Sequence, residues 1–168
     1  MSEDTSGIHG EITVVLTGPD GEEKARYVGK NLVTAVGDQY YAGRAALSSG
    51  LPAQVTGFRL GTGSTAVAKT GAGAAVVTYL ATSNKANDAT FPTAAAGVVT
   101  WKRTYAPGEA TSASAITEVV LNTDTIANDN ATTATAANTI ARALIAGVAS
   151  KAAGDTLTIT WTHTLLGA

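Results

Sequence analysis

The stretch Thr156-Leu157-Thr158-Ile159-Thr160-Trp161-Thr162-His163-Thr164-Leu165 has the strictest alternation in this chain. Every second residue is a threonine, and the residues between them are apolar apart from His163. Side chains of a strand point alternately to its two faces, so the pattern predicts a strand with one core face and one row of threonines. That row either faces solvent or meets a partner subunit.

Similar patterns recur along the rest of the chain. Alternation over 11–17 and 23–28, joined at Pro19-Asp20-Gly21, predicts a β-hairpin, because Pro and Gly fix the turn. Further strands are expected at 55–60, 75–81, 98–105 and 116–121. Many short strands with turns between them favour a mainly β fold: an antiparallel β-sandwich, jelly-roll-like, with one or two short helices.

One helix is predicted to begin at Ala35 with Thr34 as its N-cap. Its apolar stripe includes Val36, Tyr40 and Leu47, and Gly50 is the expected C-cap. Residues 138–148 fit a second short helix by spacing, although their β-branched residues leave a strand open.

The remaining segments define the domain organisation. Residues 1–9 are expected to form a flexible or partner-docked N-terminal arm, followed by a single β-sandwich domain over residues 10–168. Residues 82–97 are predicted to be a long loop, and residues 123–136 form a polar Asn/Asp/Thr/Ala segment.

The composition restricts the classes of function. Charged residues make up 14% of the 168 residues and the formal net charge is −2, so a basic nucleic-acid surface is not expected. There is no cysteine, which excludes disulfides and thiolate metal sites. Neither a signal peptide nor an apolar run long enough to cross a membrane is recognised. A surface with so few charges is either a neutral exterior or one that is buried against other subunits.

No residue pattern predicts catalysis. His9 and His163 are far apart in sequence, and His163 is expected to be a core or rim histidine. The segment 61–64 (Gly-Thr-Gly-Ser) lacks the phosphate-loop frame. Glu109 and Glu118 are not linked by any motif. We therefore predict no catalytic, cofactor-binding or metal-ligating residues, and a protein that is not an enzyme.

A weak cation site remains open in the polar segment. Its oxygen-bearing side chains do not fit the EF-hand frame, because Asp129 and Thr135 stand where a Gly and a Glu are required. The side chains concerned are Asp124, Asn128, Asp129 and Asn130.

The order of motifs resembles a family of tailed-bacteriophage virion proteins. After the opening hairpin the chain has Asn-Leu-Val-Thr-Ala-Val-Gly at 31–37, then Leu-Gly-Thr-Gly at 60–63 and Ile-Thr-Glu-Val-Val-Leu at 116–121. The alternating terminal strand completes the resemblance, which covers most of residues 11–166. The chain departs from the family's pattern at Val120, where a glycine is usual.

The resemblance implies a capsid decoration (cement) protein at the virion surface, assembled in the host cytoplasm. Its expected partners are the major capsid protein and further copies of itself, as a dimer or trimer, with neither nucleic acid nor a membrane. The alternatives are a tail-fibre, head-fibre or baseplate module and, more remotely, a carbohydrate-binding module. A carbohydrate-binding module would need solvent-facing aromatic side chains, whereas Trp101 and Trp161 lie on apolar strand faces.

Overall fold

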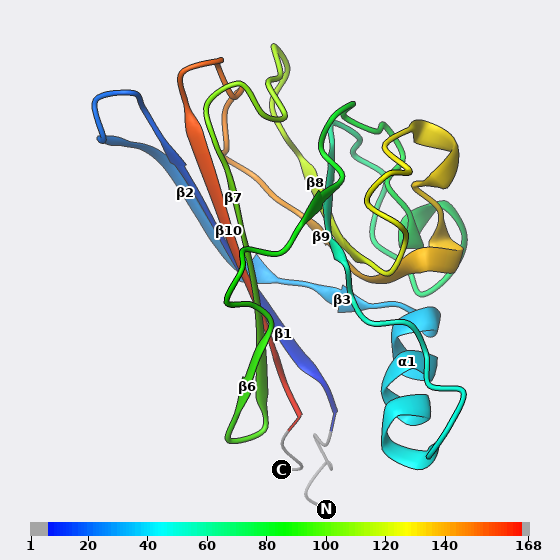
Figure 1. Ribbon diagram of the computed structural model, residues 1–168. Coiled ribbons are helices and arrows are strands. Elements are labelled where there is room, and N and C mark those ends of the chain that lie inside the picture. The colour runs from blue at the N-terminus through cyan, green and yellow to red at the C-terminus, as the bar shows by residue number, and fades with distance from the viewer. Residues whose placement is uncertain (1–6, 166–168) are drawn as a thin grey trace, which may run out of the picture.

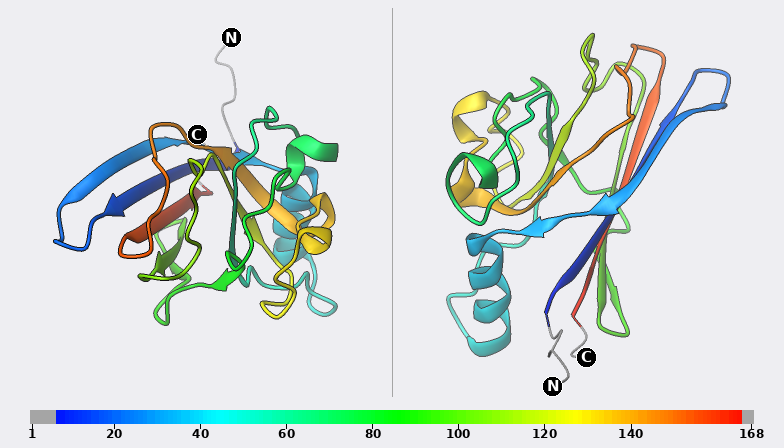
Figure 2. Two further views of the ribbon diagram at one scale, coloured as in Figure 1. Left: turned by 90° about the horizontal axis from the view of Figure 1, so that it is seen from above. Right: turned by 180° about the vertical axis from the view of Figure 1, so that it is seen from behind.

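The computed structural model describes residues 7–165 and consists of two antiparallel sheets of five strands each (Figure 1). Sheet A has the order β2-β1-β10-β7-β6, and sheet B has the order β3-β9-β8-β4-β5. The sheets face each other as a β-sandwich, and the helix α1 lies beside sheet B (Figure 2). The predicted fold class is confirmed.

The bounds of the elements are as follows. Sheet A contains β1 (His9–Thr17), β2 (Glu23–Lys30), β6 (Thr93–Ala95), β7 (Val98–Tyr105) and β10 (Thr156–Thr164). Sheet B contains β3 (Leu32–Val33), β4 (Gly57–Gly61), β5 (Lys85–Ala86), β8 (Glu118–Asn122) and β9 (Thr139–Leu144). The helices are α1 (Ala35–Ala46) and three 3₁₀ turns, η1 (Gly71–Ala74), η2 (Ala131–Thr133) and η3 (Ala136–Asn138).

Early strands pair with late ones in a nested manner. β1 pairs with β10, β3 with β9 and β4 with β8. This nesting gives the sandwich its jelly-roll-like character. The predicted hairpin is confirmed as β1 and β2, and the alternation of β10 appears directly in its burial: its apolar residues and His163 are buried, and its threonines are half-buried.

The hydrophobic core lies between the inner faces of the two sheets. Sheet A contributes large side chains and sheet B smaller ones, and α1 adds Tyr40. The core members on the strands are Ile12, Val14, Leu16, Phe58, Leu60, Trp101, Tyr105, Val119, Leu121, Ile140, Ala141, Ala143, Leu157, Ile159 and Trp161. Fully burying such side chains contributes about 1.5–3 kcal/mol each relative to exposure, so this core is the main source of stability.

The helix begins as predicted but ends earlier. The Thr34 hydroxyl accepts a hydrogen bond from the Gly37 amide at 3.0 Å, which makes it the N-cap. The last helical residue is Ala46 and the C-cap is Leu47, so the prediction of Gly50 as C-cap was wrong. Gly50 does adopt a positive φ, of 61°, but in the loop beyond the helix.

The strand predicted at 75–81 does not form, apart from a single bridge between Gly61 and Tyr79. The amides of Val77 and Thr78 instead donate to the Glu118 carboxylate, so they are unavailable for a strand ladder. The predicted loop 82–97 contains the short strands β5 and β6, and residues 139–144 are a strand and not a helix.

Of the predicted arm of residues 1–9, residues 1–6 lie outside the described residues. His9 is the first residue of β1, paired with Thr164 of β10. None of the helices in residues 7–165 is long and apolar enough to span a membrane.

Candidate functional site

The outer faces of the two sheets differ sharply. On sheet B, the outward positions of β4, β8 and β9 carry charged side chains: Arg59 lies opposite Val120, which lies opposite Arg142. Long loops fold over these side chains and bury them completely. On sheet A, no loop or helix lies over the outer face of β1 and β10 (Figures 1 and 2), and the loop after β5 contacts the β7 margin, where Asp88 accepts from the Thr104 hydroxyl and Phe91 lies beneath Lys102. The polar chemistry of the molecule is therefore concentrated beneath the loops of sheet B.

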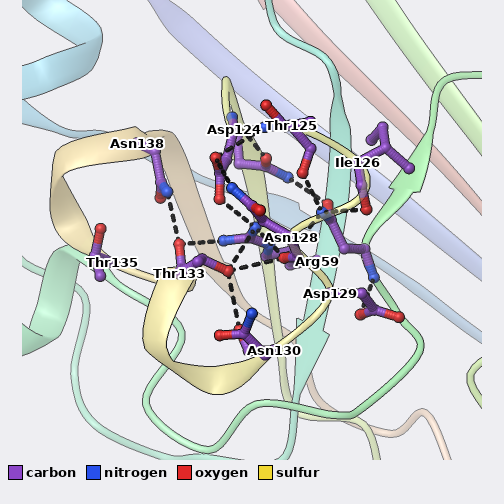
Figure 3. A network of polar contacts seen from close by, with 12 residues as sticks. Arg59, Asp124, Thr125, Ile126, Asn128, Asp129, Asn130, Thr133, Thr135 and Asn138 are labelled. Atoms are coloured by element: carbon purple, nitrogen blue, oxygen red, sulfur yellow. Dashed lines mark hydrogen bonds and ion pairs between the residues drawn. The ribbon is translucent and has the colours of Figure 1, made fainter.

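Arg59 organises the polar segment 124–133 (Figure 3). Its guanidinium forms a 2.7 Å ion pair with Asp124 and donates to the Asn128 carbonyl at 2.9 Å. It also donates to the Thr133 carbonyl and, at 3.1 Å, to the Thr133 hydroxyl. A single buried side chain thus ties together three points of the loop.

The Asp124 carboxylate is fully used within this network. Its second oxygen accepts from the Thr125 amide at 2.8 Å and from the Asn128 side chain at 3.0 Å. Desolvation alone would raise the pKa of Asp124, but hydrogen bonds from Arg59 and Asn128 outweigh it and hold the pKa below its usual value. The sequence left a weak cation site open at Asp124, and in the structure the Arg59 guanidinium neutralises this carboxylate.

The other oxygen-bearing side chains of the segment point to different partners. Asp129 accepts from the Tyr79 hydroxyl and from the Asn84 amide, and Asn130 caps η2 through the Thr132 amide. Within residues 7–165, no group of three or more His, Cys, Asp or Glu side chains could hold a metal ion.

A second buried centre pairs Glu118 with Arg142. The two side chains are 0% exposed and meet at 2.7 Å. The Glu118 carboxylate also accepts from the amides of Gly63 and Thr78, each at 2.9 Å, and of Val77 at 3.1 Å. Arg142 in turn donates to the carbonyls of residues 65 and 73. The pair therefore fixes the whole loop that follows β4.

Glu118 does not form a carboxylate pair with Glu109. Glu109 binds Arg103 of sheet A at 2.5 Å, whereas Glu118 binds Arg142 of sheet B. Each of these two carboxylates is thus engaged by its own arginine, so Glu109 and Glu118 do not face each other across a shared opening as the acids of a glycoside hydrolase do.

His163 and His9 lie on neighbouring strands of sheet A, and their side chains are on opposite faces of the sheet. His163 points inward and is 0% exposed, whereas His9 is exposed. Trp161 donates its indole N–H to His163 Nε2 at 3.0 Å, and the Asn31 amide reaches the same nitrogen at 3.0 Å. An indole can only donate, so Nε2 is the acceptor and the proton lies on Nδ1, directed at the Tyr41 hydroxyl.

Burial lowers the pKa of His163 to about 4. The imidazole is therefore neutral at physiological pH, and its ring links β10 to α1 through Tyr41 and to the β2–β3 junction through Asn31. Its role in this geometry is that of a satisfied core histidine, as the alternation of the strand predicted.

The glycines at 61–64 serve close packing. A Cβ on Gly61 or Gly63 would come within 2.4 or 2.6 Å of Glu118 Oε1, so both positions require glycine. The two motifs Leu60–Gly63 and Ile116–Leu121 thus meet as one unit. Val120, the departure from the resembled pattern, packs with Val76, Ala134 and Tyr79 beneath the loops.

Sequence reasoning missed the central role of Arg59 and Arg142. Each stands alone in an otherwise uncharged, small or apolar strand, Phe58-Arg59-Leu60 and Ala141-Arg142-Ala143. An isolated arginine at an outward position of a buried strand was the available signal, because such a charge must be paired where loops cover it.

Comparisons of the chain with protein-family models, with curated proteins and with solved structures gave no match.

Proposed function

We propose that this chain is a structural subunit of a tailed-phage virion, a capsid decoration protein that binds the outer surface of the icosahedral shell and bridges neighbouring capsid subunits. The proposal rests mainly on one observation: the buried charged side chains bind the protein's own loops. Arg59, Glu118 and Arg142 hold the protein's own loops, whereas most of the outward side chains of β1, β10 and β7 are threonines.

Buried charges that hold loops, together with a threonine-rich outer sheet face, suit a structural subunit that binds its partners over a wide surface. Burying neutral threonines and alanines against a partner costs less desolvation than burying charges. The loops above sheet B are already held by multiple hydrogen bonds, so little conformational entropy remains to be lost when they meet a partner. A ligand that binds only the assembled shell stabilises it by mass action.

The resemblance to virion proteins supports the same proposal. Two of its motifs, Leu60–Gly63 and Ile116–Leu121, are joined by the hydrogen bond from the Gly63 amide to Glu118. A third, residues 31–37, contains the helix N-cap Thr34, whose hydroxyl also donates to the Thr139 carbonyl at 2.6 Å. The motifs thus coincide with contacts that position sheet B, its loops and α1.

The carbohydrate-binding alternative receives no support from the aromatic residues. Trp101 is 2% exposed and Trp161 is 0% exposed, so neither indole can stack on a sugar at the surface. Both belong to the core between the sheets.

The test is co-sedimentation of the purified protein with phage heads that lack it, followed by heating of the heads. The proposal expects saturable binding at a fixed ratio to the capsid subunit and a higher rupture temperature. Absence of head binding refutes the decoration role. Binding to isolated tails in its place would establish the tail-fibre or baseplate alternative.

A further inference from the structure

The outer face of sheet A is a regular grid of threonines. The strand registers place outward residues in rows across the sheet, for example Val28, Thr13, Thr160 and Lys102. On β1, β10 and β7 we define these outward residues as the threonine face. It contains nine threonines: Thr13, Thr17, Thr100, Thr104, Thr156, Thr158, Thr160, Thr162 and Thr164.

The threonine face carries very little charge. Its other members are Val15, Val98, His9, Glu11 and Lys102, so one acid and one lysine are its charged side chains. On β2 the outward residues continue with Val28, which is 55% exposed, and with the charged Arg26 and Lys30, so the charges of the outer face gather along its β2 margin. Charge-depleted surfaces of this kind are typical of the centres of protein interfaces.

The dimensions of the whole of sheet A match those of a two-copy interface. β10 has nine residues, which at about 3.4 Å each span roughly 30 Å, and the five strands, β2 and β6 included, have four spacings of about 4.8 Å that span roughly 20 Å. The footprint is about 600 Å² per copy, or about 1,200 Å² for two, at the lower end of the range for specific interfaces, with the threonine face as its centre and β2 and β6 as its margins. Two such sheets can pack face to face with their strands within about 30°.

The two charges of the face are arranged for self-recognition. Glu11 lies on β1, opposite Lys30 of β2 within the same copy, and Lys102 lies on β7, on the other side of the central strand β10. Glu11 is level with Thr162, and Lys102 is level with Thr160, one outward row away. A two-fold axis parallel to β10 exchanges the β1 and β7 sides. It therefore brings Glu11 of one copy close to Lys102 of the other, twice.

We propose that the threonine face binds a second copy of this chain, related by a two-fold axis along β10, with two Glu11–Lys102 ion pairs across the interface. The contact forms in solution and does not depend on the virion role, so the two proposals can fail separately. Threonine methyl groups supply the apolar contact, and their hydroxyl groups can pair with each other across the interface.

The experiment is sedimentation velocity over a range of concentrations, with thermal melting to verify the fold of each variant. The wild-type chain should sediment as a species of twice 16.8 kDa. Glu11→Lys and Lys102→Glu each place like charges together and should weaken dimerisation by at least about tenfold. The double charge swap restores opposite charges and should recover most of the affinity.

Thr160→Lys, at the centre of the face, should give monomers, whereas Thr70→Lys is the matched control. Thr70 is exposed next to η1, outside sheet A, and receives the same change of side chain and charge. A wild-type monomer at every concentration overturns the proposal. It is also overturned if the double swap fails to restore a dimer that the single swaps break, or if Thr70→Lys disrupts the dimer as strongly as Thr160→Lys.

Discussion

Replacing Glu118 by glutamine should destabilise this protein strongly, although the change exchanges a single oxygen for an NH₂ group. The carboxylate is 0% exposed, and its two oxygens accept from three backbone amides and from Arg142. Glutamine keeps the shape but replaces one acceptor oxygen by an NH₂ donor. Either orientation of the amide then sets a donor against another donor, and Arg142 is left as a buried, uncompensated cation.

The magnitude follows from this geometry. Removing one partner of a buried ion pair typically costs about 3–5 kcal/mol, since the remaining charge stays desolvated. For a chain of 168 residues, each 1 kcal/mol lowers the melting temperature by about 2–4 °C. The melting temperature of Glu118→Gln should therefore fall by about 6–20 °C.

The assay is calorimetry or urea unfolding of the variant beside Glu109→Gln. The control makes the same chemical change in a carboxylate that is 30% exposed and paired with Arg103. An ion pair of this partly exposed kind contributes less than about 1 kcal/mol, so the control should melt within about 4 °C of the wild type.

Equal melting temperatures of Glu118→Gln and the Glu109→Gln control would refute this prediction. A second readout guards against global unfolding as a trivial result: amide exchange at Gly63, Val77 and Thr78 should accelerate more than exchange in β10. Unchanged protection at these three amides would show that the carboxylate does not hold the loop.

Three further outcomes are expected. The folded-state pKa of His163, about 4, lies below its unfolded value of 6.5, so its contribution is complete above pH 6.5 and declines as the pH falls towards 4. This amounts to a loss of about 2 kcal/mol between pH 7.5 and 5, which urea titrations at the two pH values would measure and His163→Gln would abolish. Arg59→Met should leave the half-buried Asp124 without its cation, and limited proteolysis should then cut within residues 124–133 of a chain whose near-ultraviolet circular dichroism is retained; resistance equal to wild type would contradict this. Thr34→Ala removes the helix cap and should cost about 1–2 kcal/mol in urea unfolding, whereas a neutral result would mean that α1 is held by packing alone.

Local patterns sufficed to predict the sandwich because its inner strands obey simple periodicity. The alternation in β10 and β1, the turn at Pro19-Asp20-Gly21 and the cap at Thr34 each depend on neighbours within a few residues. In such segments the local preference and the final structure agree, which is the expected condition for a reliable prediction.

The covered face of sheet B could not be predicted in the same way. Val76 and Val77 have the composition of a strand, yet the Val77 amide is bound by Glu118, 41 residues later. Arg59 meets Asp124 across 65 residues. These contacts are decided by which loop folds over which strand, and hydrophobic periodicity contains no information about that choice.

The same contrast explains why the candidate interface is on sheet A. A sheet face can be completed by the chain's own loops, by a partner or by water. On sheet B the chain supplies the cover and commits Arg59, Glu118 and Arg142 to holding it. Over β1 and β10 of sheet A it supplies none, and these strands present threonines. Threonine hydroxyl groups form hydrogen bonds with water, and they lose little free energy when a similar surface replaces that water. The side that lacks internal anchors is thus the side suited to an intermolecular contact, which is why the charge swap between Glu11 and Lys102 is the most direct test of whether this face binds a second copy.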